Sequence, residues 1–298
     1  MVTFNLHGEL GNQMFEWATG IAYSRLHKTN LEFKTLPGVV ARMSEFTTSQ
    51  HYSIKESSVA NNQLGLFARI ARKAKLNSPF DKTQLEKGLN FQHLEYVEGS
   101  TYHGYFQSWR YFHELRDLLI SEFSLLEPSD GFGELNASLK GDFTAIHIRR
   151  GGSGAAILTS DYHGLLDVEY YNRAISLNEE LGGSKKYVIF TDNPEKALET
   201  VQRLHIQDAR IIGPRDTHSQ TENLLLMTKA TSFIGANSSY SWWAAYLNQC
   251  LLTKPIFPRQ WYMDPDLSNN DMLLPDWLSV GFSQFLNEEA PRGIHLEQ

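Results

Sequence analysis

The sequence predicts an α/β protein built from two doubly wound, Rossmann-like domains that face each other across a cleft. The chain opens with a strand, a glycine-containing turn, a helix and a second strand, and a strand and helix alternation restarts near residue 142. At 298 residues the chain exceeds the usual size of a single domain. We therefore expect one domain at 1–135 and another at 136–298, with the change of pattern at 127–141.

The first domain begins with the apolar segment 2–6 ("VTFNL"), which predicts a strand. The turn "HGELG" separates it from 12–28, where apolar residues recur at helical spacing, and "LEF" at 31–33 predicts the next strand. A strand, helix and strand in this order predict a parallel sheet whose ligands bind at the carboxyl ends of its strands. Residues 38–100 lack a clear period and predict loops and short helices, whereas 109–123 predicts a helix.

The second domain repeats the strand and helix alternation to near its end, which is typical of a doubly wound sheet. The predicted strands are 143–150, 186–192, 209–213, 231–235 and 254–258, and the predicted helices are 166–181, 193–204, 221–230 and 238–250.

Composition excludes several classes of protein. Hydrophobic residues make up 41% and charged residues 20%, which is typical of a globular protein and excludes a disordered one. A net charge of −7 argues against a nucleic-acid binder. One cysteine, Cys250, excludes an internal disulfide, and we expect it to pack inside a helix in a cytoplasmic protein. No stretch has the length of a membrane span, although the basic amphipathic segment 66–76 could contact a membrane or a lipid-linked substrate.

The stretch "AIHIRRGG" places two arginines directly after an apolar strand. Neighbouring side chains on a strand point to opposite faces, so Arg149 and Arg150 cannot both lie along one solvated surface. A guanidinium matches phosphate oxygens in a bidentate way, and the carboxyl end of such a strand is where phosphate ligands bind. The alternative is that carboxylates of the sheet hold both arginines.

Two other segments offer groups for an anion. "HGELGNQ" lacks the glycines of a dinucleotide fingerprint, which argues against a nicotinamide cofactor, but Asn12 could cap the following helix or point its amide into the cleft. "GANSSYSWW" places Asn237, Ser238 and Ser239 at a strand end and helix start, where hydroxyls and backbone N–H groups bind phosphate. Beside an arginine pair in the same sheet, phosphate binding is a better interpretation than capping alone.

A metal site is not expected. Asp264 and Asp266 in "MDPDLS" match the D-x-D pattern that holds a divalent cation in many transferases, but turn chemistry explains both residues in this proline- and asparagine-rich stretch. Arginines that neutralise a diphosphate would make a cation unnecessary.

Taken together, "LHGELGNQMFEWA", "GYFQSWRYF", "AIHIRRGG", "HGLLDVEYY", "YVIFTDNPE" and "ENLLLMTKATSFIGANSSYSWWAA" resemble the bacterial α1,2-fucosyltransferases of glycosyltransferase family 11. The resemblance spans residues 3 to 258 and implies a GT-B fold, GDP-fucose as donor, inversion at the anomeric carbon, no required metal and no other cofactor. It also implies that 1–135 holds the acceptor and 136–298 the donor.

The resemblance assigns roles to single residues. It implies that Arg149 holds the diphosphate, that His147 approaches the guanine, and that Glu222 accepts hydrogen bonds from guanine N1 and N2. Arg150 would orient its loop or meet a carboxylate. Asp192 would support the site or contact the sugar nucleotide. The residues predicted to bind the donor are Gly11, Asn12, His147, Arg149, Arg150, Asp192, Glu222, Asn237, Ser238 and Ser239, and those predicted to act in catalysis are Arg149, Asn12, Asp161 and His163.

The acceptor side is less determined by the sequence. Asp161, His163 and Glu9 are all open as the base that accepts the acceptor's proton. The family usually has an aspartate where this chain has Gly152, and a glycine where it has Glu9, which would repel a diphosphate unless its side chain points away. The resemblance implies transfer to O2 of a terminal β-galactose, on which the aromatic residues Trp17, Tyr105, Phe106 and Trp109 could stack. Transfer to another linkage or acceptor, or a non-catalytic GDP-sugar or glycan-binding protein, are the alternatives.

Overall fold

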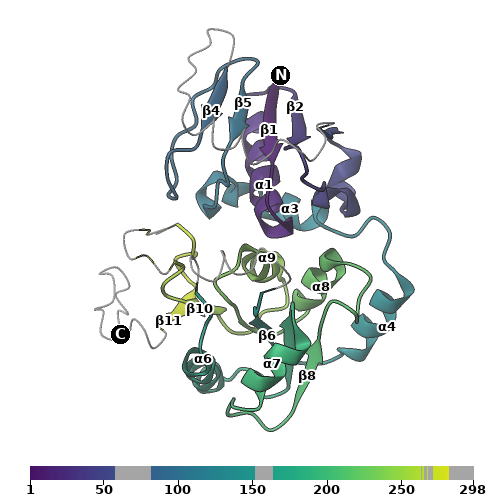
Figure 1. The fold of residues 1–298 in the computed structure, drawn as a ribbon, viewed down its shortest axis with the longest axis vertical. Coiled ribbons are helices and arrows are strands. Elements are labelled where there is room, and N and C mark those ends of the chain that lie inside the picture. The colour runs from purple at the N-terminus through teal and green to yellow at the C-terminus, as the bar shows by residue number, and fades with distance from the viewer. Residues whose placement is uncertain (58–81, 152–163, 263, 265–266, 268–270, 282–298) are drawn as a thin grey trace.

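The protein consists of two parallel β-sheets with helices packed around each, stacked one above the other (Figure 1). A computed structural model describes residues 1–57, 82–151, 164–262, 264, 267 and 271–281. The predicted pair of doubly wound domains is confirmed, and the fold is GT-B-like.

The first sheet has five parallel strands in the order β3-β2-β1-β5-β4. Its central strand alternates buried and half-buried residues, because one face packs against α1 and the shared core. Strands β2 and β3 lie on one side of β1, and β5 and β4 lie on the other. The direction in which the strand order runs therefore reverses beside β1. The strands are β1 (Val2–Leu6), β2 (Leu31–Thr35), β3 (Ile54–Lys55), β4 (Thr83–Leu85) and β5 (Thr101–His103).

The second sheet has six parallel strands in the order β11-β10-β9-β6-β7-β8, which is the strand order of a complete Rossmann fold. Every residue of β6 and β7 is buried, as expected for central strands covered on both faces. The order reverses between β6 and β9. The strands are β6 (Thr144–Ile148), β7 (Tyr187–Thr191), β8 (Ala209–Ile212), β9 (Ser232–Ile234), β10 (Ile256–Pro258) and β11 (Leu278–Val280).

Side-chain caps fix where several of the helices begin. Asp167, Asn193 and Ser219 each accept a hydrogen bond from the backbone N–H three residues later. The α-helices are α1 (Leu10–Leu26), α3 (Arg116–Glu122), α4 (Asp130–Ser138), α6 (Val168–Glu180), α7 (Pro194–Val201), α8 (Gln220–Met227) and α9 (Ser239–Leu247), and the 3₁₀ helices are η1 (Arg42–Glu45), η2 (Thr47–Gln50), η3 (Trp109–Tyr111) and η4 (His113–Leu115).

Three local predictions were wrong. The segment 38–100, predicted as loops and short helices, also forms the short strands β3 and β4. The expected helix at 109–123 is broken into η3, η4 and α3, because Phe112 leaves helical geometry with φ −142° to place its ring in the core. Cys250 is exposed and lies beyond the end of α9, which stops at Leu247, so it does not pack inside a helix.

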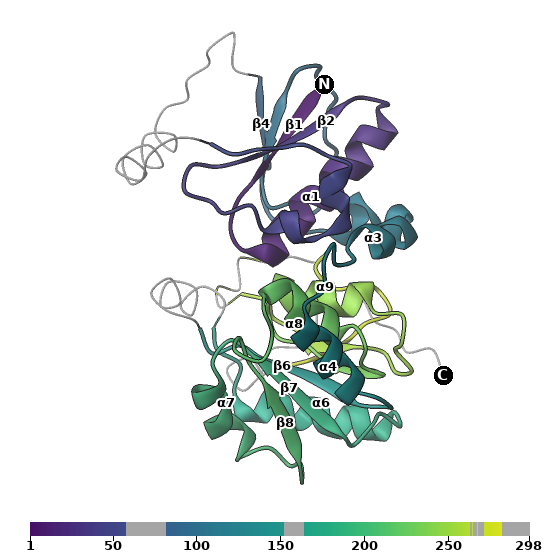
Figure 2. The ribbon, with the colours of Figure 1, turned by 90° about the vertical axis from the view of Figure 1, so that its right-hand side faces the viewer.

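One apolar core joins the two domains. Helix α1 of the first domain lies against α9 of the second (Figure 2). The Phe15 ring lies 4.6 Å from that of Trp242, and Phe112 stacks on Trp243 at 5.2 Å. Arg116 donates two hydrogen bonds to carbonyl oxygens at the end of α9, at 3.0 and 3.1 Å. These contacts hold the carboxyl ends of the two sheets near each other.

Helix α4 contacts α8 of the second domain, and the predicted boundary after residue 135 falls inside it. None of the described helices combines the length and the apolar character that a membrane crossing requires.

Candidate active site

The candidate site lies where β6 and β9 end side by side. The two strands pair in parallel, with Ile146 opposite Ile234, so the residues that follow them emerge at one edge of the sheet. Arg149 and Arg150 follow β6, and the segment 235–238 follows β9 and leads into α9. This is the point at which the strand order reverses, where open α/β sheets bind ligands.

Arg150 is held by its own domain. Its Nε and Nη2 donate to the Thr200 hydroxyl at 3.1 and 2.6 Å, and Nη1 donates to the carbonyl oxygens of Leu166 and Arg149. The carboxylate of Asp192 accepts from the backbone N–H of Arg150 at 2.7 Å and of Gly151 at 3.0 Å. Arg150 and Asp192 therefore fix the turn after β6, and the Arg150 side chain meets no carboxylate within the described residues.

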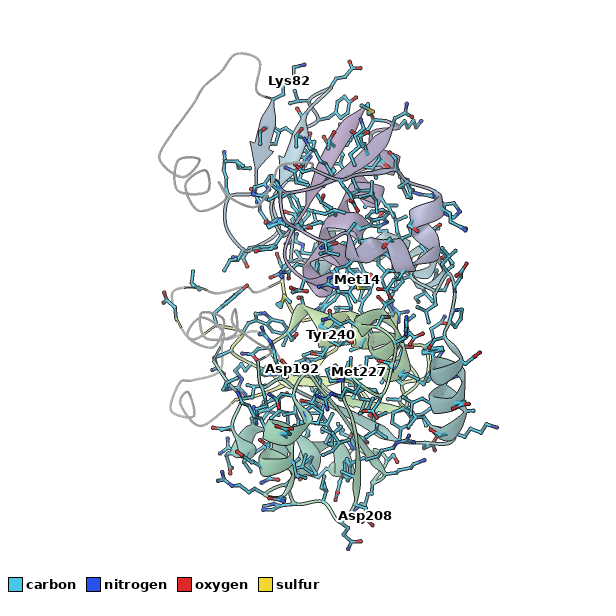
Figure 3. The ribbon with its side chains drawn as sticks, turned by 45° about the vertical axis from the view of Figure 1, so that its right-hand side comes forward. Met14, Lys82, Asp192, Asp208, Met227 and Tyr240 are labelled. Atoms are coloured by element: carbon cyan, nitrogen blue, oxygen red, sulfur yellow. The ribbon has the colours of Figure 1, made fainter. Side chains whose placement is uncertain are left out.

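Arg149 has a different environment. No hydrogen bond or ion pair engages its half-buried guanidinium among the residues that the structure describes. Burial lowers its pKa and the nearby Asp192 opposes that effect, but an arginine stays charged at neutral pH. Asp192 lies with Tyr240 on the side of the second domain that faces the first (Figure 3). Arg149 thus supplies an available positive charge at the sheet edge.

His147 lies two residues before Arg149 and on the same face of β6. Its ring is buried at 5.7 Å from that of Tyr240, and its Nδ1 has no hydrogen-bond partner within the described part of the chain. The pKa of His147 is lowered to about 4. Burial is the largest cause, Asp192 opposes it, and the nearby Arg149 adds to the lowering. The imidazole is therefore neutral at neutral pH and contributes hydrogen-bonding groups rather than charge.

The first turn of α9 offers donors to an anion. Ser238 is the N-cap residue, but its side chain makes no capping bond, and its hydroxyl has no partner among the described residues. The N–H groups of Ser239, Tyr240 and Ser241 in the first turn have no partner within the helix, and Gly11 of α1 packs against that of Tyr240. Asn237 is buried beside them. The structure thus brings Arg149, Ser238 and the start of α9 to one edge.

The first domain reaches this edge through α1. Asn12 is the third residue of the helix and Glu9 is its N-cap, so the interpretation of Asn12 as a cap was wrong. The Asn12 Oδ1 accepts from the Ser239 hydroxyl at 2.9 Å and from Gln107 Nε2 at 2.8 Å. Asn12 therefore links both domains at the start of α9.

Gly11 permits the same approach by having no side chain. A Cβ at this position would lie 2.6 Å from the Tyr240 nitrogen and 2.7 Å from the Ser239 carbonyl carbon. The Gly11 carbonyl also accepts from Trp243 Nε1 at 3.0 Å. Gly11 thus contributes to the site by allowing α1 to contact the backbone of α9.

Glu222 already makes two hydrogen bonds. It is 3% exposed, and its two carboxylate oxygens accept from the backbone N–H groups of Ser129 and His218, each at 2.8 Å. Burial alone would raise the pKa of this carboxyl, but these hydrogen bonds and His218 hold it below its usual value. The carboxylate ties the start of α8 to the segment before α4, and a guanine would compete with these donors.

Only two of the four aromatic residues predicted to stack on the acceptor are exposed or half-buried. Trp17 and Phe106 are fully buried, and Trp17 stacks on Phe33, so neither can contact an acceptor. Tyr105 is 40% exposed and Trp109 is half-buried, which leaves these two available.

The Glu9 side chain is exposed and its carboxylate pairs with Arg42 at 3.2 Å. Gly152, Asp161, His163, Asp266 and the segment 66–76 lie outside the described residues. Within the described ranges, no group of three or more histidine, cysteine, aspartate or glutamate side chains could hold a metal ion.

The sequence interpretation missed a titratable cluster in the first domain. At the ends of β1 and β5, the His7 ring stacks with those of His103 and Tyr105, and His7 also contacts the buried Glu16. A glutamate inside the apolar run "MFEWA" was the available signal, because a buried carboxylate needs a specific partner.

The sequence profile of "Glycosyl transferase family 11" matches residues 1–281. The chain belongs to glycosyl transferase family 11. An α1,2-colitosyltransferase from Escherichia coli is 27% identical over 293 residues, which cover 94% of this chain and 99% of that protein. The O-antigen biosynthesis glycosyltransferase WbnK from Escherichia coli is 26% identical over 198 residues, 64% of each chain. Galactoside α-(1,2)-fucosyltransferase 2 from Hylobates lar is 25% identical over 259 residues, 83% of this chain and 69% of that protein.

Among solved structures, the α1,6-fucosyltransferase NodZ soaked with GDP-fucose is similar to this family 11 chain with a TM-score of 0.48. The sequence identity is 12%, and the match covers 83% of this chain and 92% of that one. A structure of POFUT1 in complex with GDP has a TM-score of 0.41 at 12% identity, covering 85% of this chain and 96% of that one.

Proposed function

We propose that this family 11 glycosyltransferase transfers L-fucose from GDP-fucose to O2 of a terminal β-galactose on a glycan, with inversion and without a required metal. The observation that supports it most is the pairing of an uncommitted Arg149 guanidinium with the uncapped start of α9 at the strand reversal. This arrangement suits a nucleoside diphosphate. The names of the α1,2-fucosyltransferase relatives support the sugar and the linkage.

The proposed chemistry needs stabilisation of a leaving group. When the bond between fucose C1 and the β-phosphate oxygen breaks, its electron pair and the negative charge remain on GDP. Arg149, the Ser238 hydroxyl and the N–H groups of α9 would stabilise that charge, and Asn12 would hold Ser239 in place. His147 and Glu222 stay predictions for the guanine end, while Asp161, His163 and Glu9 stay predictions for the base.

The acceptor site would lie on the first domain, with Tyr105 and Trp109 beside the sugar. A site built around the axial hydroxyl of galactose leaves buried polar groups unpaired with glucose, a penalty of roughly 1–3 kcal/mol. A lipid-linked galactoside would also fit the basic segment 66–76, which stays a prediction.

A colitosyl donor is the second candidate, because the Escherichia coli α1,2-colitosyltransferase matches almost the whole chain. The GDP donor site and the α1,2 linkage would be the same in both cases. A transferase of another linkage and a non-catalytic GDP-sugar or glycan-binding protein are the remaining alternatives.

The test combines calorimetry with GDP and a GDP-release assay. GDP-fucose and GDP-colitose would each be offered with lactose, N-acetyllactosamine and cellobiose, and products assigned by NMR. We expect GDP binding and fucosylation at galactose O2 of the first two acceptors, far above cellobiose. GDP binding without turnover on any acceptor would favour the binding protein, and a linkage other than galactose O2 would refute the acceptor assignment.

Metal independence is tested in the same assay. We expect EDTA to leave the transfer rate unchanged, because a guanidinium and helix N–H groups would stabilise the diphosphate. Loss of activity with EDTA and recovery with manganese would refute this part and assign a role to Asp264 and Asp266.

A further inference from the structure

The first domain carries a buried histidine and glutamate pair at its own strand reversal. His7 directly follows β1, beside the end of β5, where the order of the first sheet changes direction. Glu16 lies on α1, is fully buried, and accepts the His7 backbone N–H with Oε2 at 2.9 Å. Its Oε1 lies 2.5 Å from His7 Nδ1, at ion-pair distance, and neither of these two atoms makes a hydrogen bond within the described residues.

The two ring nitrogens of His7 have different surroundings. Nδ1 is buried against Glu16, whereas Nε2 is not buried and no described residue hydrogen-bonds it. The side chain is 14% exposed and its ring is stacked with His103 at 4.7 Å and with Tyr105 at 4.2 Å. The ring is therefore held in one orientation, with one nitrogen on a carboxyl and the other free.

A series of contacts connects this pair to the start of α9. Tyr105 stacks on His7, and Gln107, two residues later, donates to Asn12 at 2.8 Å. Asn12 in turn accepts from Ser239 on α9 at 2.9 Å. His7 thus lies on the part of the first domain that contacts the start of α9.

We infer that His7 is the catalytic base that accepts the proton of the acceptor hydroxyl, and that Glu16 positions it. The inference rests on the proposed function. As the acceptor oxygen forms its bond to fucose C1 and the C1–O bond to GDP breaks, the hydroxyl proton moves to His7 Nε2. Nδ1–H stays against the Glu16 carboxylate, whose negative charge stabilises the imidazolium.

How well His7 can act as a base at a given pH depends on its own pKa and on three titratable groups near the pair, Glu16, His103 and Glu86. Burial and the neighbouring His103 lower the pKa of His7 to about 4. Burial raises the pKa of Glu16 well above its usual value, the His7 N–H opposes this, and Glu86 raises it further. Burial lowers the pKa of His103 and raises that of Glu86. His7 can accept the acceptor's proton only when Glu16 is ionised and Nε2 carries no proton. An additional proton on either residue therefore blocks the base.

The test compares the wild-type full chain with two single variants, His7→Gln and Glu16→Gln. Glutamine at 16 keeps the bond to the His7 N–H, but its amide donates to Nδ1 and so leaves the proton on Nε2, the wrong tautomer. We expect kcat with GDP-fucose and a β-galactoside to fall by ~10²–10⁴ in either variant. We expect unchanged GDP affinity by calorimetry. We also expect kcat of the wild type to rise with pH and this rise to be lost in both variants.

His51 and Glu122 provide a matched control, because they form a second histidine and glutamate pair, at 3.0 Å, in which the histidine is exposed. His51→Gln and Glu122→Gln should keep the wild-type kcat and pH profile. Should His7→Gln fail to fold, as judged by thermal melting, Glu16→Gln decides the question. Wild-type kcat and an unchanged pH profile in a folded variant would overturn the base assignment alone, whereas a wild-type protein without any transfer from GDP-fucose would overturn the proposed function.

Discussion

Arg149 and Arg150 are neighbours in sequence, yet one is held by its own domain and the other is free for a ligand. Four hydrogen bonds to Thr200, Leu166 and the backbone of Arg149 account for the Arg150 guanidinium. The strand pleat sends Arg149 to the opposite face, which it shares with His147, and the ring of His147 lies 5.7 Å from that of Tyr240 on α9. Substituting the two residues should therefore affect different properties of the protein.

We expect Arg149→Ala to reduce transfer by on the order of 3 kcal/mol in barrier, because it removes the charge opposite the leaving diphosphate. Its melting temperature should stay near that of wild type. Arg150→Ala should instead lower stability by on the order of 2 kcal/mol, since it leaves buried acceptors unpaired. Transfer kinetics and thermal melting of both variants check this, and a wild-type rate in folded Arg149→Ala would refute the assignment of the donor site.

His147 gives the donor side a pH dependence of stability. Its folded pKa of about 4 lies below the unfolded value of 6.5 because burial disfavours the charged ring. Between these values the unfolded chain binds a proton that the native protein does not, so stability falls as pH decreases through this window.

We expect urea unfolding of wild type to show a loss of up to about 3 kcal/mol from this residue between about pH 7 and about pH 4. His147→Gln removes that titration and should make the dependence less steep, while the contribution of His7, whose pKa is also lowered to about 4, remains. An equally steep decline in His147→Gln would show that other groups cause the acid sensitivity.

At the scale of elements, the contact between α1 and α9 builds the site. Both helices begin at the gap between the domains, and only a glycine at position 11 lets the first turn of α1 contact the backbone of α9. The Trp243 indole and the Asn12 side chain then bond across this contact. The start of α9 is thereby held in position for a phosphate.

We expect Gly11→Ala to lower the melting temperature and weaken GDP binding, because the added Cβ would lie 2.6 Å from the Tyr240 nitrogen and force the helices apart. Gly133→Ala in α4 is the control, since a Cβ there meets no atom within 4 Å. That variant should be as stable as wild type or gain about 0.5–1 kcal/mol from helix propensity. Melting curves and GDP calorimetry check both, and normal GDP binding by Gly11→Ala would contradict the argument.

At the scale of the whole molecule, the two domains share one core. Rings from Phe15 and Phe112 of the first domain pack on Trp242 and Trp243 of the second without a polar layer between them. Separating the domains would expose this apolar surface, so neither half is expected to unfold alone.

Calorimetry should show a single unfolding transition, and GDP should shift the whole transition to higher temperature because it binds only the folded protein. Two separated transitions, with only one responding to GDP, would show that the domains unfold independently.

The sequence by itself determined the two doubly wound sheets, because alternating strand and helix periods and buried runs such as "TAIHI" leave few other arrangements. It also predicted that Arg149 and Ser238 share one edge of the second sheet, since residues that follow parallel strands emerge at one edge. The sequence could not show which of Arg149 and Arg150 is held by its own domain, or that Tyr105 is exposed while Phe106 is buried. These differences depend on contacts with residues far away in the chain. Only the tertiary structure brought His7 to Glu16 and Asn12 to Ser239, because folding, not local preference, sets the distance between residues that are remote in sequence.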